Sequence, residues 1–438
     1  MTTKDQGHLL RVLGMAFGVA AVVGGTIGQG VLRAPGVVAT GVQDATVILA
    51  LWVMVGVFAA IDAMSTVELA ASVRKTGGPY AFAHRAFGRF GGLAVGIADW
   101  LGYVGAVAFL GVVFGEYLHR LGIATTIPIS ALAIGILLVI GAIQALGTRI
   151  GGASQEIGSA IKALMFLALI GALMLAPRSA PVETLHAGAP LTLLGLIVAF
   201  RAIAGTYTGW NAAAYFAEEV RDPGKTIVRA TFSGIALVTV IYVLANAAYL
   251  MVLTPAEMAG NNLVAADAAA RVFGPVADRI VTAISLISLV TILNAILMSQ
   301  PRLVYAIARD AGIPGLSRVA ANGSPQFALA FMVVAAGLLA LVGVYEILLA
   351  FSAALTTAVA VCVNVAALWL RRKEPDLERP WRMPLFPLPA LFSLLVNGAI
   401  LAAFLYEAPV IAAQAYAGLI VLTALAYVIT RRRAPIAA

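Results

Sequence analysis

The sequence of 438 residues is poor in cysteine, histidine and charge. Its single cysteine, Cys362, excludes an intramolecular disulfide, and no cysteine or histidine cluster has the spacing of a metal site. The histidines lie in the N-terminal segment, in loops or at the ends of apolar runs, at His8, His84, His119 and His186. We therefore expect no metal and no cofactor, and no pattern indicates the paired acid and base groups of an enzyme.

Only 11% of the residues are charged, whereas 62% are hydrophobic and the mean hydropathy is +0.99. These values exceed what the core of a soluble protein requires, so the sequence predicts an all-α integral membrane protein in a lipid bilayer. Runs long enough to span, at about 20 residues each, lie near 11–38, 45–70, 91–118, 127–146, 157–176, 190–216, 228–253, 280–308, 326–343, 346–370, 388–406 and 410–430. We expect about twelve transmembrane helices.

The positive charges predict the orientation, because loops that stay in the cytoplasm are rich in Lys and Arg. With the N-terminus inside, the cytoplasmic side receives Arg74, Lys75, Arg85, Arg89, Arg149, Arg221, Lys225, Arg229, Arg309, Arg318, Arg371, Arg372, Lys373, Arg379, Arg382 and Arg431 to Arg433. The opposite loops keep only Arg120, Arg178, Arg271 and Arg279. We expect a multi-pass protein of the cell (inner) membrane with both termini cytoplasmic, and the basic charge requires no nucleic acid.

Two apolar segments about 180 residues apart are interrupted by glycine at mid-length. Residues 22–30 read VVGGTIGQG and residues 202–210 read AIAGTYTGW. Non-helical backbone at membrane depth survives only where it lines a protected cavity. Matching interruptions in two halves of a chain indicate a carrier whose substrate lies between them. The alternative is that these glycines only let helices pack closely, which would explain a single motif better than two matched ones.

Such breaks expose main-chain groups at the ends of opposed half-helices. Amides at the start of the second half-helix would hold a carboxylate, and they belong to Gly28, Gln29 and Gly30. Carbonyls that end the first halves would hold an ammonium, and they surround Thr26, Ile27, Ala204, Gly205 and Thr206. This pairing predicts a zwitterionic α-amino acid as the substrate. Tyr207 and Trp210 either pack nearby or lie beside the substrate.

Several motifs resemble the amino acid, polyamine and organocation superfamily of permeases over nearly the whole chain. The first-span motif is VGGTIGQGV at 23–31, and the second span and its loop contribute EL at 68–69 and GGPY at 77–80. The sixth-span signature is YTGWN at 207–211, with EE at 218–219 and DP at 222–223. Arg302 with ARDAGIP at 308–314 resembles the end of the eighth span.

The resemblance implies a LeuT-like fold with a five-plus-five inverted repeat and broken first and sixth helices. The expected segments are a cytoplasmic N-terminus at 1–10, a first repeat at 11–178, a second repeat at 190–372, two further spans at 388–430 and a cytoplasmic C-terminus at 431–438. It also implies a secondary active transporter that works by alternating access on a substrate with a free amino group. For amino acids we expect coupling to protons. Exchange of amino acids, amines or polyamines is the alternative, and a substrate sensor or a channel represents a different class.

The chain departs from the family pattern at three positions. Gln29 stands where the family usually has a small residue, so it crowds the carboxylate site or adds an amide donor. Gly205 replaces a bulky gating aromatic, which indicates a wider pocket or a gate made by another residue. Arg201 is unusual within an apolar span and, if it faces the pocket, should favour neutral or acidic side chains.

Other charged residues within the spans are candidates for function, because placing them there is costly. Lys162, near the inner end of the fifth span, either snorkels to the headgroups or occupies the position where sodium-coupled relatives of the fold hold an ion and loses its proton during the cycle. Arg33 and Arg201 either line the outer vestibule or pair with Glu116, Asp62 or Asp44. We expect Glu68 to pair with an arginine at the inner gate. The oligomeric state is left open.

Overall fold

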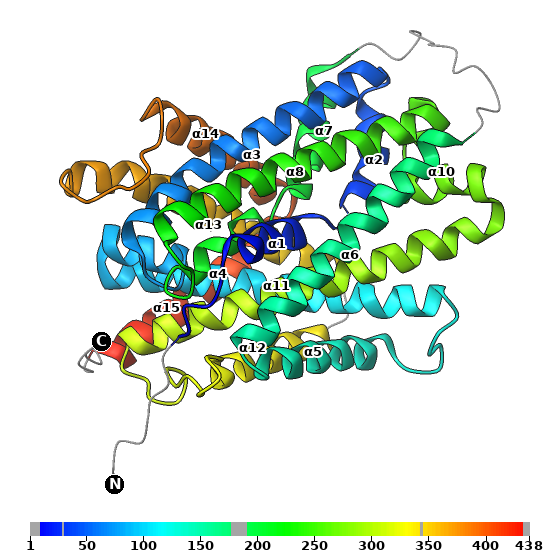
Figure 1. Cartoon of the computed structure of the whole chain (residues 1–438). Coiled ribbons are helices and arrows are strands. Elements are labelled where there is room, and N and C mark those ends of the chain that lie inside the picture. The colour runs from blue at the N-terminus through cyan, green and yellow to red at the C-terminus, as the bar shows by residue number, and fades with distance from the viewer. Residues whose placement is uncertain (1–8, 29, 177–190, 342–344, 432–438) are drawn as a thin grey trace.

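The computed structural model describes residues 9–28, 30–176, 191–341 and 345–431, and these residues form helices joined by turns and loops (Figure 1). The first part comprises α1 (Met15–Thr26), α2 (Gly30–Gly41), α3 (Ala45–Val73), α4 (Pro79–Arg120), α5 (Ile129–Ala145) and α6 (Thr148–Leu175). The middle comprises α7 (Leu193–Thr206), the 3₁₀ helix η1 (Trp210–Phe216), α8 (Pro223–Val252), α9 (Pro255–Met258), α10 (Val264–Phe273), η2 (Gly274–Val276) and α11 (Ala277–Asp310). The last part comprises α12 (Gln326–Ala340), α13 (Tyr345–Lys373), α14 (Leu388–Glu407) and α15 (Pro409–Arg431).

The all-α membrane architecture is confirmed. Within the described residues, nine helices are long and apolar enough to cross a bilayer, and the bent pair of α1 and α2 raises the number to ten. Two further apolar helices, α5 with 17 residues and α12 with 15, are shorter. The expected number of about twelve is reached only when both short helices also span, so it stays a prediction together with the inverted repeat.

The connection between α8 and α11 forms short helices. Residues 254–276 fold into α9, α10 and η2 before α11 begins at Ala277. Thr254 caps α9, since its hydroxyl accepts from the Glu257 amide at 3.3 Å and its amide donates back to the Glu257 carboxylate at 2.8 Å. The Thr254 amide and the Arg271 side chain together lower the pKa of Glu257. The other long loop, 177–190, lies outside the described residues.

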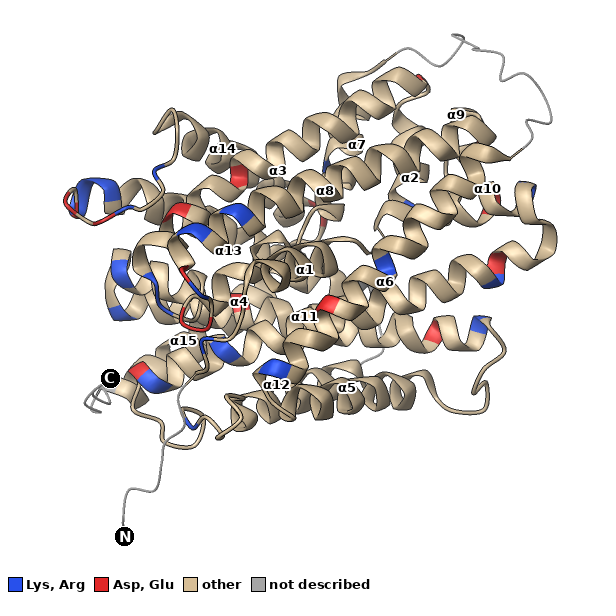
Figure 2. Ribbon diagram, in the orientation of Figure 1, with Lys and Arg blue, Asp and Glu red and all other residues tan. Residues whose placement is uncertain are grey.

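Charged side chains gather at one end of the bundle (Figure 2). This basic end carries the turns at 74–78, 217–222 and 311–325 and the loop at 374–387. The opposite end carries the turns at 121–128 and 253–263, and the helices between the two ends are almost free of charge. The asymmetry fits the positive-inside rule, and the assignment of the basic end to the cytoplasm stays a prediction.

The core lies where the broken helices meet the long ones. α1 packs against α6, α8, α11 and η1, while α2 packs mainly against α7. Among the largest fully buried side chains are Trp52, Tyr242 and Phe17. The Tyr242 ring contacts those of Trp52 and Tyr207 edge to face, with centroids 5.4 and 5.1 Å apart. These aromatics surround the two helix breaks.

Candidate functional site between two broken helices

Both predicted interruptions are present, but they differ in form. α1 ends at Thr26 and α2 begins at Gly30 with a bend of 46°. α7 ends at Thr206, and the chain continues through a turn into η1, a 3₁₀ helix rather than a restarted α-helix. Gly209 precedes η1 with φ of 104°, a conformation that glycine adopts far more easily than other residues. The sequence therefore placed both breaks correctly and missed the 3₁₀ geometry of the second.

The two breaks touch through their main chains. A Cβ atom on Gly209 would lie 2.4 Å from the carbonyl oxygen of Gly25 and 2.8 Å from its carbonyl carbon. A Cβ on Gly30 would lie 2.6 Å from the Thr206 side chain. Glycine is thus required at Gly25, Gly30 and Gly209 because two interrupted helices approach each other backbone to backbone.

Replacing Gly209 by alanine is expected to destabilise the protein by at least about 1–3 kcal/mol, since the new Cβ meets fixed backbone and the positive φ is strained. Gly205→Ala is the matched control, because a Cβ at Gly205 meets nothing within 4 Å. Thermal unfolding of the purified variants in detergent checks the comparison. Equal unfolding temperatures for both variants would contradict the close contact.

Carbonyl groups from both breaks converge on one side chain. The hydroxyl of Tyr242, on α8, lies 2.9 Å from the Thr26 carbonyl oxygen and 3.0 Å from that of Thr206. A hydroxyl has one proton, so it satisfies only one of these carbonyls at a time. The Thr26 hydroxyl is also buried and has no hydrogen-bond partner among the described residues. The point of convergence therefore offers acceptors to a further donor.

Lys162 lies at this same place, at mid-length in α6 rather than near its inner end. Its side chain is fully buried, so it does not snorkel to a membrane surface. Its ammonium donates to the carbonyls of Gly24 at 2.7 Å and Ile27 at 2.6 Å, and Ser288 on α11 donates to Ile27 at 3.1 Å. Lys162 thus caps the carbonyl end of α1 with a positive charge.

The amide side of the first break is formed by the residues at the N-terminus of α2. Gly28 is buried and close to Ile292, where a Cβ on the glycine would lie 2.8 Å from the Ile292 side chain. Gly30 opens α2, and its amide is one of the unpaired donors of a helix start. Gln29 lies outside the described residues, so its predicted effect on the carboxylate site stays a prediction.

The second break is open on one side. Gly205 and Thr208 are exposed, and they continue a stripe of α7 that begins at Leu194 and passes through Val198 and Arg201. Residues at these spacings share a face of a helix. Tyr207 is buried and reaches the Trp52 carbonyl at 3.2 Å, and the Ala204 carbonyl accepts from its amide at 3.1 Å. The exposed face of α7 therefore runs from the opposite end to the break, and its apolar side chains, such as Leu194 and Val198, suit contact with lipid.

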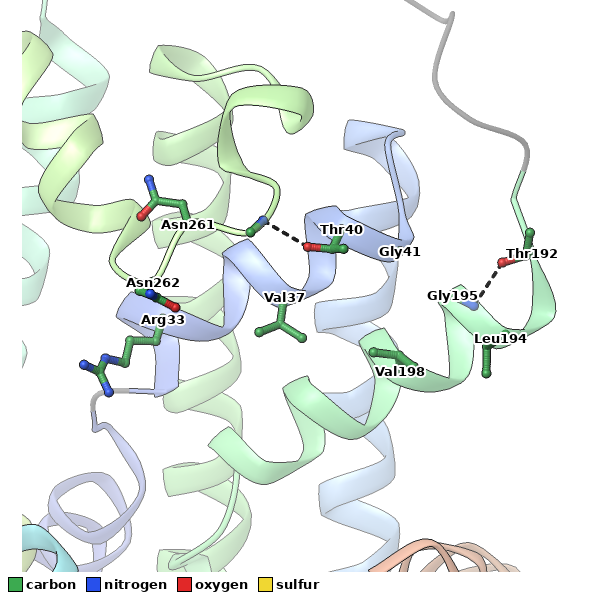
Figure 3. A pocket seen from close by; sticks show the side chains of 11 residues that line it. Arg33, Val37, Thr40, Gly41, Thr192, Leu194, Gly195, Val198, Asn261 and Asn262 are labelled. Carbon is green, nitrogen blue, oxygen red and sulfur yellow. Dashed lines mark hydrogen bonds between the residues drawn. The ribbon is translucent and has the colours of Figure 1, made fainter. Parts of the chain in front are cut away.

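A cavity of about 700 Å³ lies at the top of this face, between α2, α7 and the turn after α9 (Figure 3). Its wall includes Arg33, Val37 and Val198, and Thr40 holds the turn in place by accepting from the Gly260 amide at 2.9 Å. The Arg33 guanidinium also lies over the Tyr117 ring, 6.0 Å from its centroid. Arg33 therefore lines this cavity, and its predicted role in the outer vestibule stays a prediction.

Arg201 has a partner that the sequence did not indicate. Its guanidinium forms an ion pair with Glu407, at the end of α14, and lies over the Phe404 ring at 5.8 Å. The expected partners Glu116, Asp62 and Asp44 are therefore wrong for Arg201. Its charge is compensated by a carboxylate, which weakens the expectation that it repels cationic substrates.

Glu68 does pair with arginine. Its carboxylate accepts two bonds from Arg371, at 2.7 and 2.6 Å, and one from the Met383 amide at 2.6 Å. Arg379 lies 3.5 Å away. These contacts tie α3 to the end of α13 and to the loop that leads into α14, at the basic end.

A second ion pair closes the basic end below the breaks. Glu219, directly after η1, is fully buried and accepts from Arg302 on α11 at 2.7 and 2.9 Å. Thr148, the first residue of α6, lies within hydrogen-bond distance of both. Leu13 and Val220 form a β-bridge beside them. These contacts join η1, α6, α11 and the segment before α1 at the basic end.

Sequence reasoning missed Tyr242 and the buried cluster below Trp210. Trp210 begins η1 and, with Asn211, lines a small cavity in which Asp99 also lies. Tyr242 could have been selected from the sequence because it is a tyrosine within an apolar span.

A helical membrane protein in which two broken spans meet, with carbonyls from both breaks sharing one hydroxyl donor and a buried lysine at the junction, has the architecture of a transporter. The family model described as amino acid permease matches residues 8–429. The chain therefore belongs to the amino acid permease family, and the superfamily resemblance is confirmed. Members of this family are transporters and not enzymes.

Curated relatives agree with this assignment. The chain is 26% identical to the serine/threonine exchanger SteT of Bacillus subtilis (strain 168), over 90% of this chain and 91% of SteT. It is 27% identical to the b(0,+)-type amino acid transporter 1 of Mus musculus, over 93% and 84% of the two chains. It is also 27% identical to the large neutral amino acids transporter small subunit 2 of Rattus norvegicus, over 87% and 74%.

Proposed function

We propose that this protein is a secondary active transporter that carries α-amino acids across the cell membrane by alternating access. The observation that carries the proposal is the convergence of the Thr26 and Thr206 carbonyls on the single hydroxyl of Tyr242. The hydroxyl can donate to only one of these carbonyls at a time, so the other would accept from a substrate ammonium. The names of the relatives, all amino acid transporters or exchangers, support the same substrate class.

The substrate would lie between the two breaks. Its ammonium would bind the carbonyls near Thr26, Ile27, Gly205 and Thr206, and its carboxylate would bind the amides at Gly28, Gln29 and Gly30. A helix N-terminus suits the negative group and the carbonyl ends suit the positive one. This arrangement selects the zwitterionic head that all α-amino acids share and leaves the side chain to the surrounding walls.

Alternating access would work between two closed ends. The Glu219–Arg302 pair and the Leu13–Val220 bridge would close the basic end. With the basic end in the cytoplasm, breaking these contacts would open the two breaks to the inside. The five-plus-five repeat, 11–178 against 190–372, would supply the rocking halves, and both termini would be cytoplasmic.

Coupling would depend on Lys162. Its ammonium is buried against the carbonyl end of α1, and among the described residues no carboxylate forms an ion pair with it. Release of its proton during the cycle would link substrate movement to a proton gradient. Exchange of one amino acid for another is the second candidate, and the name of the relative SteT favours it.

Blocking either end of the amino acid head is expected to weaken binding by at least about tenfold, because each end loses a charge-assisted interaction. A panel of free amino acids, their N-acetyl derivatives and their methyl esters, measured by thermal stabilisation and by competition for uptake into liposomes, checks this. The free acids should stabilise the protein and the blocked forms should not. Equal stabilisation by all three forms would reject the proposed site.

A further inference from the structure

A small cavity of about 60 Å³ lies below the breaks, between α3, α4, η1 and α13. A single water needs only about 10–15 Å³ of such space, so a larger group can enter. Its walls include two acidic side chains, Asp62 and Asp99, and no lysine or arginine. Trp210 and Asn211 form another wall, and they follow directly after the turn that breaks α7.

The acidic side chains have only neutral hydrogen-bond partners. Asp99 is 1% exposed, and one of its oxygens accepts from the Tyr215 hydroxyl at 2.6 Å. Asp62 accepts from the side-chain amides of Asn397 at 2.8 Å and Asn364 at 3.4 Å. Buried carboxylates are costly without a positive partner. The wall of the cavity therefore contains two acidic groups and no basic group that could pair with them.

A second, independent feature indicates a missing ligand. The Thr66 side chain lines the cavity and is 7% exposed, yet its hydroxyl has no hydrogen-bond partner among the described residues. The second carboxylate oxygen of Asp99 likewise has no donor within the described part of the chain. Buried polar groups are nearly always paired. Both groups are thus available to a donor that enters the cavity.

The remaining walls suit an organic cation. Trp210 and Tyr103 contribute aromatic rings, and Val359 and Val363 contribute apolar surface from α13. Aromatic faces attract ammonium and guanidinium groups, and apolar walls accommodate the methylene stem beside them. A bare sodium ion would be expected in a cage made of oxygen atoms alone.

We propose that this cavity receives the cationic head of a substrate side chain, so that the protein selects amino acids with a basic side chain. This inference rests on the proposed amino acid transport and adds its substrate class. The head would bind Asp99, Asp62 and Thr66 while the α-ammonium and carboxylate stay at the breaks. The positive charge of Arg201 does not exclude a cationic substrate, because Arg201 forms an ion pair with Glu407.

The test compares arginine with citrulline and lysine with norleucine, pairs that differ mainly in side-chain charge. Competition for uptake into liposomes gives a preference ratio within one preparation, so the folded fraction cancels. The wild-type protein should prefer each basic member at least about tenfold, and Asp99→Asn should lose most of that preference. Asp278→Asn, which removes an exposed carboxylate paired with Arg120, is the matched control and should keep the ratio.

Other outcomes would overturn the inference. If the wild type takes up neutral amino acids but its preference ratio for basic over neutral members is near one, only the proposed basic selectivity is wrong. If the wild type takes up no amino acid at all, the proposed transport function is wrong as well. Sodium can be tested without amino acid by comparing thermal stability in sodium chloride and in choline chloride. If sodium stabilises the wild type and this effect is lost in Asp99→Asn, the cavity binds an inorganic cation instead. If Asp99→Asn does not fold, Thr66→Val is tested instead, because this variant keeps both carboxylates. An unchanged preference ratio in Thr66→Val would contradict the proposal.

Discussion

Lys162→Ala is expected to abolish accumulation of amino acid against its gradient. The lysine ammonium is the donor to the Gly24 and Ile27 carbonyls at the end of α1, and in the proposed mechanism it also carries the coupling proton. Loss of the side chain leaves buried carbonyls short of a donor, at about 1–3 kcal/mol each. Uptake into liposomes with an imposed pH gradient measures the effect. Accumulation by the variant at the wild-type level would show that Lys162 is not the coupling site.

Lys162→Arg separates coupling from structure. A guanidinium keeps positive charge and hydrogen-bond donors at this position but does not release its proton in proteins. We therefore expect the arginine variant to lose pH-driven accumulation while it retains more counterflow exchange than the alanine variant. If the wild type itself shows counterflow and no response to the pH gradient, exchange replaces proton coupling as the function.

The membrane class and the positions of both helix breaks could be predicted from the sequence, because each depends on local information. Hydropathy sets which segments enter the bilayer, and clustered glycines mark where a helix is interrupted. The contact between Gly25 and Gly209 could not be predicted in the same way, since it depends on how two distant segments meet. The sequence showed glycine at both positions, and the structure shows that the close backbone contact leaves no room for a side chain at Gly209.

The sequence could not predict which charged residues form ion pairs with each other. Arg201 pairs with Glu407 and Glu68 with Arg371, across separations of about 200 and 300 residues. Lys162 was predicted at an inner helix end because hydropathy gave too short a fifth span, whereas α6 begins at Thr148. Tyr242 is a single tyrosine among apolar neighbours, and only the convergence of two broken helices on its hydroxyl distinguishes it.

Arg302→Met is expected to destabilise the protein by about 3–5 kcal/mol, because it leaves the Glu219 carboxylate buried without its cation. The side chains of Arg302 and Glu219 are 3% and 0% exposed, so water does not replace the lost partner. Denaturant titration of the purified protein in mixed micelles measures the loss. Adding Glu219→Gln to the same variant should recover much of it, since the isolated charge rather than the missing pair is the main cost.

The neighbouring pair of Arg309 and Glu218 is the matched control, because it joins α11 to the same short segment after η1. Its side chains are 18% and 26% exposed, and its atoms lie 3.1 Å apart. Because water reaches this half-buried pair, Arg309→Met should cost clearly less than Arg302→Met. Since the buried pair also holds η1 to α11, Arg302→Met should make residues near Glu219 more accessible to a water-soluble thiol reagent after a cysteine is placed at Ala217. Equal stability and accessibility in both arginine variants would show that the buried pair does not close this end.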